Sequence, residues 1–376
     1  MRVLHVYKTY YPDSVGGIEQ VLLQLTRGLQ VHGVENRIFT LSPQAQPAVL
    51  QRPEGAVYRY PITLDVASNA MSWSAMRGFA QQLAWADVVH YQFPWPFADL
   101  LHLLHRTYLQ NKATVVTYQS DVVRQRHLLR LYRPLMTRFL NTVDAVVATS
   151  PGYIATSTVL QTLAKPVHMV PNGLDETTLP PAPAERLAHW RQQCGEGFFL
   201  FVGVLRYYKG LHTLVEAARG FAGQIVLAGD GPEQASLAAQ IKALGLTNIK
   251  LLGHVDDADK RALLQLARAF VFPSHLRSEA FGMSLVEAAM QAKPLISCEI
   301  GSGTSYVNEH GVTGIVVPPE DPAALRAAMQ DLLENTAGAA RMGDAARQRY
   351  VQLFTGAHMA QAYHQIYQAL LEGKKF

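Results

Sequence analysis

The clearest structural pattern lies in the second half of the chain, in Ser278-Glu279-Ala280-Phe281-Gly282-Met283-Ser284-Leu285-Val286-Glu287. It follows a short apolar run, 269–273, which predicts a buried strand. After Gly282 the apolar residues recur at helical spacing, so a helix is expected to begin there. The start of a helix offers unpaired N–H groups and a partial positive charge, which attract an anion. The pattern therefore predicts a strand, a turn with two carboxylates and a helix, arranged to bind a ligand.

The spacing of Glu279 and Glu287 gives a first indication of that ligand. If the segment between them were fully helical, the two residues would lie roughly 12 Å apart along the axis. That is about the reach from the hydroxyls of a sugar, past a diphosphate, to a ribose, and a carboxylate can accept hydrogen bonds from two neighbouring hydroxyls. The alternative is that both are ordinary surface carboxylates near a helix start, where acidic residues are favoured anyway.

The sequence Glu-Ala-Phe-Gly-Met-Ser-Leu-Val-Glu resembles the Glu-x7-Glu motif of the retaining glycosyltransferases of family four. The resemblance extends over most of the chain. It implies the GT-B fold, an α/β architecture in which two Rossmann-like domains face each other across a cleft. It also implies that Glu279 holds the hydroxyls of the donor sugar and Glu287 the ribose. The backbone amides of Phe281, Gly282 and Met283 are then expected to hold the diphosphate.

Length and composition agree with a globular protein of two domains. The chain has 376 residues, 49% of them hydrophobic and 16% charged, with a net charge of +4. The two cysteines, Cys194 and Cys298, lie far apart and do not suggest a disulfide framework or a metal site. No apolar run approaches the roughly 20 residues that span a bilayer, and residues 2–6 predict a strand rather than a signal peptide. We expect a soluble, cytoplasmic protein that can touch the inner face of the membrane and binds no nucleic acid.

The domain boundary is expected close to Pro171-Asn172-Gly173, ahead of a proline-rich linker. Residues 1–171 alternate short apolar strands with helices, which predicts a parallel sheet covered on both faces. Residues 172–356 repeat that pattern and form the expected nucleotide-sugar-binding domain. By resemblance, the helix within 357–376 packs back on the first domain, which binds the acceptor.

Five residues of the first domain are candidate substrate contacts. The Gly16-Gly17 pair follows the first strand and opens a helix, so its backbone can approach a phosphate closely; a plain tight turn is the alternative. His90, Gln119 and Asp121 follow later strands, at whose carboxyl ends ligands of such folds collect. Many family members carry a His where this chain has Gln119, which can bind a hydroxyl but cannot carry a proton.

The second domain opens with a strand and a basic loop that contains Arg206 and Lys209. Lys209 matches the diphosphate-binding lysine of the family. Val204 occupies the position at which the family usually has an arginine, and this chain has Arg206 two residues later instead. Two surface basic residues are the alternative. By resemblance, the loop at Val255 is expected to lie along the nucleotide base. We assign no metal and no cofactor, because Asp257-Ala258-Asp259 precedes a helix and is better explained by N-capping.

A basic segment, 122–143, contains no acidic residue. Its apolar positions form one helical stripe, among them Leu131. One interpretation is a helix that packs on the core with a solvated basic face, and another is a face for anionic lipid head groups or an acceptor's pyrophosphate. The five arginines are Arg124, Arg126, Arg130, Arg133 and Arg138.

These features together predict a retaining glycosyltransferase that moves a sugar to a hydroxyl. By resemblance to bacterial O-antigen mannosyltransferases, which the loop 299–307 and the basic loop share, the expected donor is GDP-mannose and the expected acceptor a lipid-linked oligosaccharide. A UDP-hexose donor is the main rival to GDP-mannose. Two different protein classes also stay open. One is a glycosyltransferase-like protein that binds nucleotide without transfer, and the second is a Rossmann-type oxidoreductase, although the chain lacks the dinucleotide glycine spacing.

Overall fold

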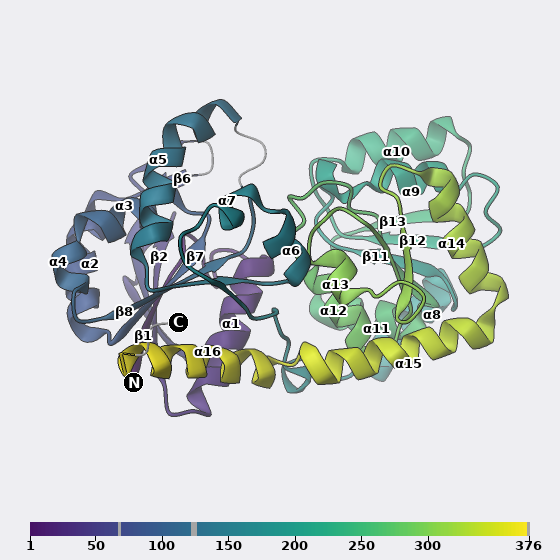
Figure 1. Cartoon of the computed structure of the whole chain (residues 1–376). Coiled ribbons are helices and arrows are strands. Elements are labelled where there is room, and N and C mark those ends of the chain that lie inside the picture. The colour runs from purple at the N-terminus through teal and green to yellow at the C-terminus, as the bar shows by residue number, and fades with distance from the viewer. Residues whose placement is uncertain (67–68, 122–125, 374–376) are drawn as a thin grey trace. The chain divides into compact units, whose positions relative to one another are not determined.

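The computed structural model describes residues 1–66, 69–121 and 126–373, with the backbone alone for residues 126–129 (Figure 1). The chain divides into two compact units, Met1–Leu174 with Gly356–Phe376, and Asp175–Thr355. The boundary lies three residues after the one expected from the sequence. The reason is that Asn172 donates to Gln119 at 3.3 Å, and the amide of Gly173 lies 3.3 Å from the Met359 sulfur. These contacts attach the Pro-Asn-Gly segment to the first unit.

The first unit contains an eight-stranded sheet in the order β10-β9-β8-β7-β1-β2-β4-β3, in which only β3 is antiparallel. Every residue of the central strands β7 and β8 is buried, as expected for parallel strands covered on both faces. The sequence did not predict β3 or the small β5–β6 hairpin. The strands are β1 Arg2–Val6, β2 Glu35–Ser42, β3 Val49–Arg52, β4 Gly55–Pro61, β5 Leu64–Val66, β6 Asn69–Met71, β7 Val88–Phe93, β8 Ala113–Tyr118, β9 Ala145–Ala148 and β10 Val167–Met169.

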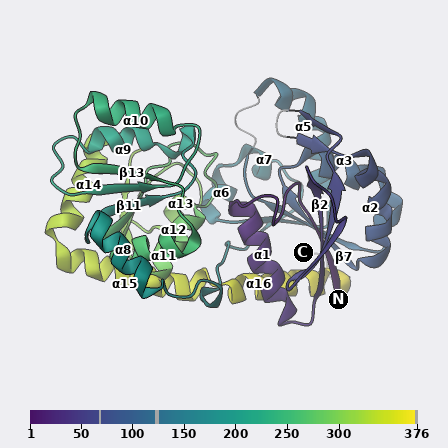
Figure 2. The same cartoon turned by 180° about the vertical axis from the view of Figure 1, so that it is seen from behind.

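The helices of the first unit come from both ends of the chain. Helix α16 lies beside α1 in both views (Figures 1 and 2), and a Cβ on Gly28 of α1 would overlap the Ala360 side chain of α16. Glycine thus allows these two helices to approach closely. The helices are α1 Gly17–Gln30, α2 Trp73–Trp85, α3 Pro96–Leu104, α4 Arg106–Leu109, α5 Arg126–Thr142, α6 Pro151–Thr156, α7 Thr158–Gln161 and α16 Gly356–Leu371.

Helix α5 departs from the predicted stripe. Met136, Phe139 and Leu140 are buried as expected, but Leu131 is 82% exposed. Leu131 lies in the half of the helix that precedes Pro134, an internal proline that removes a backbone hydrogen bond. The continuous apolar stripe predicted from the sequence is therefore wrong at Leu131.

The second unit is a parallel sheet of six strands in the order β13-β12-β11-β14-β15-β16. The strands are β11 Phe199–Val202, β12 Ile225–Ala228, β13 Ile249–Gly253, β14 Ala269–Phe272, β15 Leu295–Cys298 and β16 Gly314–Val317. The helices are α8 Ala184–Cys194, α9 Leu211–Ala217, α10 Gln234–Ala243, α11 Asp257–Leu266, α12 Met283–Met290, α13 Thr304–Val307, α14 Pro322–Glu334 and α15 Thr336–Leu353. Two Rossmann-like α/β units are thus present, as the sequence predicted.

The core of the first unit contains buried histidines. His5 on β1 is fully buried, and its Nε2 donates to the Asn36 side-chain oxygen at 3.0 Å. Burial lowers the pKa of His5 to about 4, although the hydrogen bond to Asn36 opposes this. The neutral imidazole is therefore the form that the fold stabilises.

We predict that acid destabilises the first unit through His5. Because the pKa is lower in the folded state than its ordinary value, this contribution is complete above pH 6.5 and is lost as the pH falls toward 4. Between pH 7 and 5, His5 alone accounts for a loss of about 2 kcal/mol. The measurement is urea unfolding followed by tryptophan fluorescence in a Trp190→Phe background, since the other three tryptophans lie in the first unit.

The matched control is His5→Gln, which keeps a donor for Asn36 and does not titrate. Its unfolding free energy should fall by about 2 kcal/mol less than that of the parent over the same pH interval. Equal pH dependence in the two proteins would contradict the assignment.

Candidate functional site

The candidate site of the second unit lies where the order of its strands reverses. From β11 the chain proceeds outward through β12 to β13, and from β14 it proceeds the other way through β15 to β16. The loops that follow β11 and β14 therefore diverge from neighbouring strands. In open α/β sheets this point, at the carboxyl ends of the strands, is where ligands bind.

Lys209 and Glu279 come from these two loops and form an ion pair between Nζ and Oε2. Both side chains are nearly buried, with 11% and 12% of their surface exposed. Ser274 also donates to Glu279, at 3.4 Å, and the Lys209 ammonium lies 4.5 Å from the centroid of the Phe272 ring. The structure thus brings together a cation and a carboxylate that are 70 residues apart in the chain. Both were predicted from the sequence as site residues.

Gly210 explains how the basic loop reaches this point. Its φ is +65°, and a Cβ there would overlap the Pro273 carbonyl oxygen at the end of β14. The same contact region is closed by a hydrogen bond of 3.0 Å from the His275 amide to the Tyr208 carbonyl. Burial, and then the charge of Glu279, raise the pKa of Tyr208 to about 12. The two loops are consequently fixed to each other next to the ion pair.

Helix α12 begins at Met283, later than a helix running from Glu279 would. Gly282 has φ +89°, and the amide of Leu285 donates to its carbonyl at 2.9 Å. The condition for the 12 Å spacing of the two glutamates is therefore not met. The amides of Met283 and Ser284 stand at the helix start, where N–H groups have no intrahelical acceptor. This is the arrangement expected of an anion site, and Phe281 before it is buried.

Glu287, one turn into α12, is 4% exposed. Its Oε1 accepts from Lys260 of α11 at 2.9 Å. The sequence did not indicate Lys260, because a contact between side chains 27 residues apart on different helices has no local pattern. The carboxylate of Glu287 is therefore paired inside the second unit.

The start of α11 corrects one detail of the sequence interpretation. The N-cap is Asp256, which accepts from the Asp259 amide at 2.7 Å. Neither aspartate of the Asp257-Ala258-Asp259 run is the N-cap. Asp259 instead accepts from Arg186 at 3.1 Å and from the Trp190 indole at 2.9 Å. Among the residues that the structure describes, no cluster of three or more His, Cys, Asp or Glu could hold a metal ion.

Arg206 and Val255 occupy the outer parts of the site. Arg206 is exposed at the start of the turn that ends in Lys209, and no described carboxylate pairs with its guanidinium. Val255 is half-buried in the loop after β13. Val204, which stands where the family has an arginine, is 45% exposed. The guanidinium of Arg206 is thus accessible to an anionic ligand.

A second glycine-rich loop is attached to the motif, which sequence reasoning did not foresee. The Gly303 amide donates to the Ala280 carbonyl at 2.7 Å. Arg277 donates through Nη1 to the Gly301 carbonyl. The loop after β15 is therefore fixed to the loop that carries Glu279.

In the first unit, the Gly16-Gly17 pair lies at the start of α1, as predicted. The carboxylate of Glu19 folds back over this helix start, where a Cβ on Gly16 would overlap it. Glu19 is 6% exposed and accepts from Thr9 at 2.8 Å and Ser14 at 2.7 Å. Negative charge is thus already present at this helix start, and its role as a phosphate site stays a prediction.

Gln119 lies at the end of β8 and is held on both sides of its amide. Its oxygen accepts from Asn172 at 3.3 Å, and its nitrogen donates to Gln92 at 3.0 Å. The Gln92 nitrogen in turn lies 3.4 Å from His90 Nε2. Because an amide nitrogen only donates, Nε2 is the acceptor, and the Nδ1–H donates a hydrogen bond to the Tyr367 hydroxyl oxygen at 2.7 Å.

This chain of hydrogen bonds changes the interpretation of His90. The residue is fully buried, and both ring nitrogens have protein partners, including Thr117 at 2.7 Å. Burial, and then the neighbouring His5, lower the pKa of His90 well below its usual value. His90 therefore connects α16 to Gln119 through Gln92, and its complete burial does not fit the predicted substrate contact. Asp121 is half-buried and accepts from Tyr118 at 2.8 Å and Ser157 at 2.7 Å.

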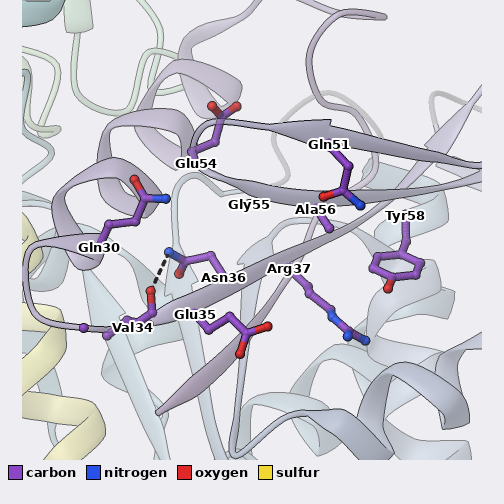
Figure 3. A pocket seen from close by; sticks show the side chains of 11 residues that line it. Gln30, Val34, Glu35, Asn36, Arg37, Gln51, Glu54, Gly55, Ala56 and Tyr58 are labelled. Carbon is purple, nitrogen blue, oxygen red and sulfur yellow. Dashed lines mark hydrogen bonds between the residues drawn. The ribbon is translucent and has the colours of Figure 1, made fainter.

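A hollow of about 530 Å³ lies elsewhere in the first unit, at the amino ends of β2 and β4 (Figure 3). Its lining includes Glu35, Arg37 and Tyr58, and Asn36 donates to the Val34 carbonyl at 3.5 Å. Since ligands of α/β sheets collect at the opposite, carboxyl ends of the strands, we do not assign the predicted chemistry to this hollow.

Comparison with known proteins agrees with the geometry. Residues 15–178 match the model of Glycosyltransferase Family 4, and residues 188–349 match that of Glycosyl transferases group 1. The chain is also 54% identical over 355 residues to the D-rhamnosyltransferase WbpZ of Pseudomonas aeruginosa, which covers 94% of this chain and 92% of the relative. The chain belongs to the glycosyltransferases of family four.

A second relative of this glycosyltransferase is the O-antigen chain mannosyltransferase C of Escherichia coli, 45% identical over 374 residues and 100% of both chains. Among solved structures, sucrose-phosphate synthase of Thermosynechococcus elongatus superposes with a TM-score of 0.81 at 21% identity, covering 99% of both chains. Anabaena HepE in complex with UDP-glucose gives 0.79 at 20% identity, covering 98% of this chain and 100% of that chain. The GT-B fold of the glycosyltransferase is thereby shown, and the oxidoreductase alternative is wrong.

We predict that Gly210→Ala destabilises the second unit by about 3 kcal/mol, since it adds a left-handed alanine and an overlap with the backbone of Pro273. The control is Gly220→Ala, whose φ of +70° imposes the same backbone cost but whose Cβ meets no atom within 4 Å. Its cost is about 1 kcal/mol. The measurement is the urea midpoint by circular dichroism. Equal midpoints for the two variants would contradict the close approach at Gly210.

Proposed function

We propose that this glycosyltransferase transfers mannose from GDP-mannose, with retention of anomeric configuration, to a lipid-linked oligosaccharide in O-antigen synthesis. The observation that carries the proposal is the Lys209–Glu279 pair at the strand reversal, beside the start of α12. The named activities of the two relatives support the sugar class and the setting. The UDP-glucose in the structural neighbour supports a nucleotide-sugar donor.

In this proposal the donor separates the ion pair. Its diphosphate binds the ammonium of Lys209, and the exposed Arg206 and the amides at the start of α12 are further positive groups beside it. Its sugar hydroxyls take the carboxylate of Glu279. In this exchange Lys209 gains an anionic partner, and Glu279 gains hydroxyl donors in place of the ammonium.

These positive groups act where negative charge develops. As the glycosidic bond breaks, the diphosphate gains charge, and fixed cations and helix-start amides stabilise it more in the transition state than in the ground state. With Lys209 and Arg206 in that role, we propose that the reaction requires no divalent metal. The leaving diphosphate then accepts the proton of the acceptor hydroxyl, since Gln119 cannot carry one.

D-Rhamnose is a second candidate sugar, because the relative with 54% identity is a D-rhamnosyltransferase. D-Rhamnose is mannose without the 6-hydroxyl, so both sugars offer Glu279 the same hydroxyls at C2 to C4. The choice between them depends on the contacts of C6, and a turnover comparison of the two GDP-sugars decides it.

The proposal predicts that GDP binds in the presence of EDTA and that UDP and ADP bind at least about tenfold more weakly. Isothermal titration calorimetry with the three nucleotides measures this. Lys209→Met should lower the affinity for GDP by about thirtyfold, since a charge-assisted hydrogen bond contributes about 2 kcal/mol. NMR of the product of GDP-mannose turnover then gives the anomeric configuration.

The control variant is Lys242→Met, which removes a lysine from the last turn of α10 and should leave GDP affinity unchanged. Preference for UDP would retain the site and overturn the donor. Binding of GDP without turnover of either GDP-sugar on membrane extracts would favour a nucleotide-binding protein without transferase activity.

We also propose that the first unit meets an anionic membrane surface. Arg130, Arg133 and Arg138 of α5 are exposed, and Leu131 among them is 82% exposed. Arg124 lies outside the described residues, as does the side chain of Arg126. None of the described helices has the length and apolar character to span a bilayer. Basic and apolar side chains next to each other are suited to head groups and the acyl boundary.

Removing Arg130 and Arg133 together, each to Gln, should lower binding to phosphatidylglycerol vesicles by about thirtyfold, since each basic residue contributes about 1 kcal/mol near such a surface. Vesicle flotation measures the bound fraction. The control removes the same charge from the second unit, with Arg219→Gln and Arg341→Gln, both exposed. Equal losses in the two double variants would show that only net charge matters and would contradict a specific role of α5.

A further inference from the structure

Lys260 is a charged side chain that the proposed reaction leaves without a role. It lies on α11 and donates to Glu287 of α12 at 2.9 Å. Only 16% of the Lys260 side chain and 6% of the Glu287 side chain are exposed. The pair therefore joins two helices of the second unit in a largely desolvated place.

The energetics of the pair are set by burial. A carboxylate that is nearly removed from water needs a cation or several donors close by, because an uncompensated buried charge is very costly. Burial would lower the pKa of Lys260, but the charges of Glu287 and Asp257 outweigh it and raise the pKa above its usual value. Lys260 is accordingly a cation at neutral pH and compensates the charge of Glu287.

The position of Lys260 is itself fixed by the start of α11. Asp256 caps the helix, and Arg186 and Trp190 of α8 hold Asp259 at 3.1 and 2.9 Å. Lys260 lies one residue later, and its second partner, Asp257, is 75% exposed at 3.1 Å. An exposed carboxylate contributes little. Of the two contacts of Lys260, the buried one with Glu287 is therefore the stronger.

We propose that Lys260 is a positioning residue that fixes the carboxylate of Glu287 for the ribose hydroxyls of the donor. This inference rests on the proposed function, in which Glu287 accepts from the ribose. Lys260 takes Oε1 and thereby selects one orientation of the carboxylate plane. Lys260 touches no part of the ligand, and its effect passes entirely through Glu287.

The consequence is a specific one for ligand recognition. If Lys260 orients the acceptor of the ribose hydroxyls, its removal weakens the binding of a nucleotide that has the 2′-hydroxyl and leaves the binding of a 2′-deoxynucleotide nearly unchanged. The ratio of the two dissociation constants isolates this effect. A general loss of structure, or a direct contact of Lys260 with base or phosphate, would weaken both nucleotides equally.

The experiment measures dissociation constants of GDP and 2′-deoxy-GDP, with UDP and 2′-deoxy-UDP in parallel, by calorimetry on the full chain. The parent should discriminate by about tenfold or more, as expected for a hydrogen bond to a charged acceptor. Lys260→Met should reduce the ratio to about two, and Lys260→Arg should restore most of it. Asp257→Asn, which removes only the exposed partner, is the matched control and should keep the parent ratio.

A double-variant cycle keeps the inference falsifiable if Lys260→Met alone folds poorly. In Lys260→Met/Glu287→Gln neither partner is charged, so no buried charge is left uncompensated. This double variant should show the same ratio as Glu287→Gln. Should Glu287→Gln retain the parent ratio, the ribose assignment in the proposed function fails. Should Glu287→Gln lose it while Lys260→Met retains it, only the positioning role fails.

Discussion

The pairing of β11 with β14, two strands far apart in the chain, determines where the charged groups of the second unit meet. Because β12 and β14 lie on opposite sides of β11, the loops that follow β11 and β14 leave the sheet in different directions. Lys209 and Glu279 occupy those two loops, and Gly210 allows the backbone to approach closely enough for their contact. The ion pair is thus a product of sheet topology and would not form from the same residues on non-adjacent strands.

The sheet of the first unit also has a point at which the strand order reverses, but the side chains near it differ. Its strands reverse between β1 and β7; the loop after β1 holds Asp13 in an ion pair with Arg59, and the amides of Gln92 and Gln119 pair near the ends of β7 and β8. Gln119, Gln92 and the neutral His90 form one directed series of hydrogen bonds. Such a network keeps the buried polar groups satisfied and gives each amide one orientation.

The sequence predicted the parts of the structure that depend on local patterns. The parallel strands, the turn before α12 and the residues Lys209 and Glu279 follow from apolar periodicity and from motif wording. Contacts between distant segments could not be predicted this way. Lys260 reaches Glu287 from another helix, and His90 is explained only once α16 is seen to cover it. Leu131 has the spacing of a buried residue, yet it lies in the part of α5 before Pro134 and is exposed. The N-cap of α11 was missed by one residue, since acidic residues so close together offer equivalent local patterns.

The docking of α16 on the first unit has a consequence for biosynthesis. The ribosome makes residues 1–174 first, but the tyrosines that cover His90 and Thr117 belong to a helix that follows the whole second unit. Until that helix emerges, His90 Nδ1 and the Thr117 hydroxyl lack their tyrosine partners, and the face of α1 that contacts α16 is uncovered. The second unit is one continuous segment, Asp175–Thr355, and can complete its core as soon as it leaves the exit tunnel. The order of maturation is therefore inverted relative to the order of translation, and a shortened transcript would impair the half that was made first.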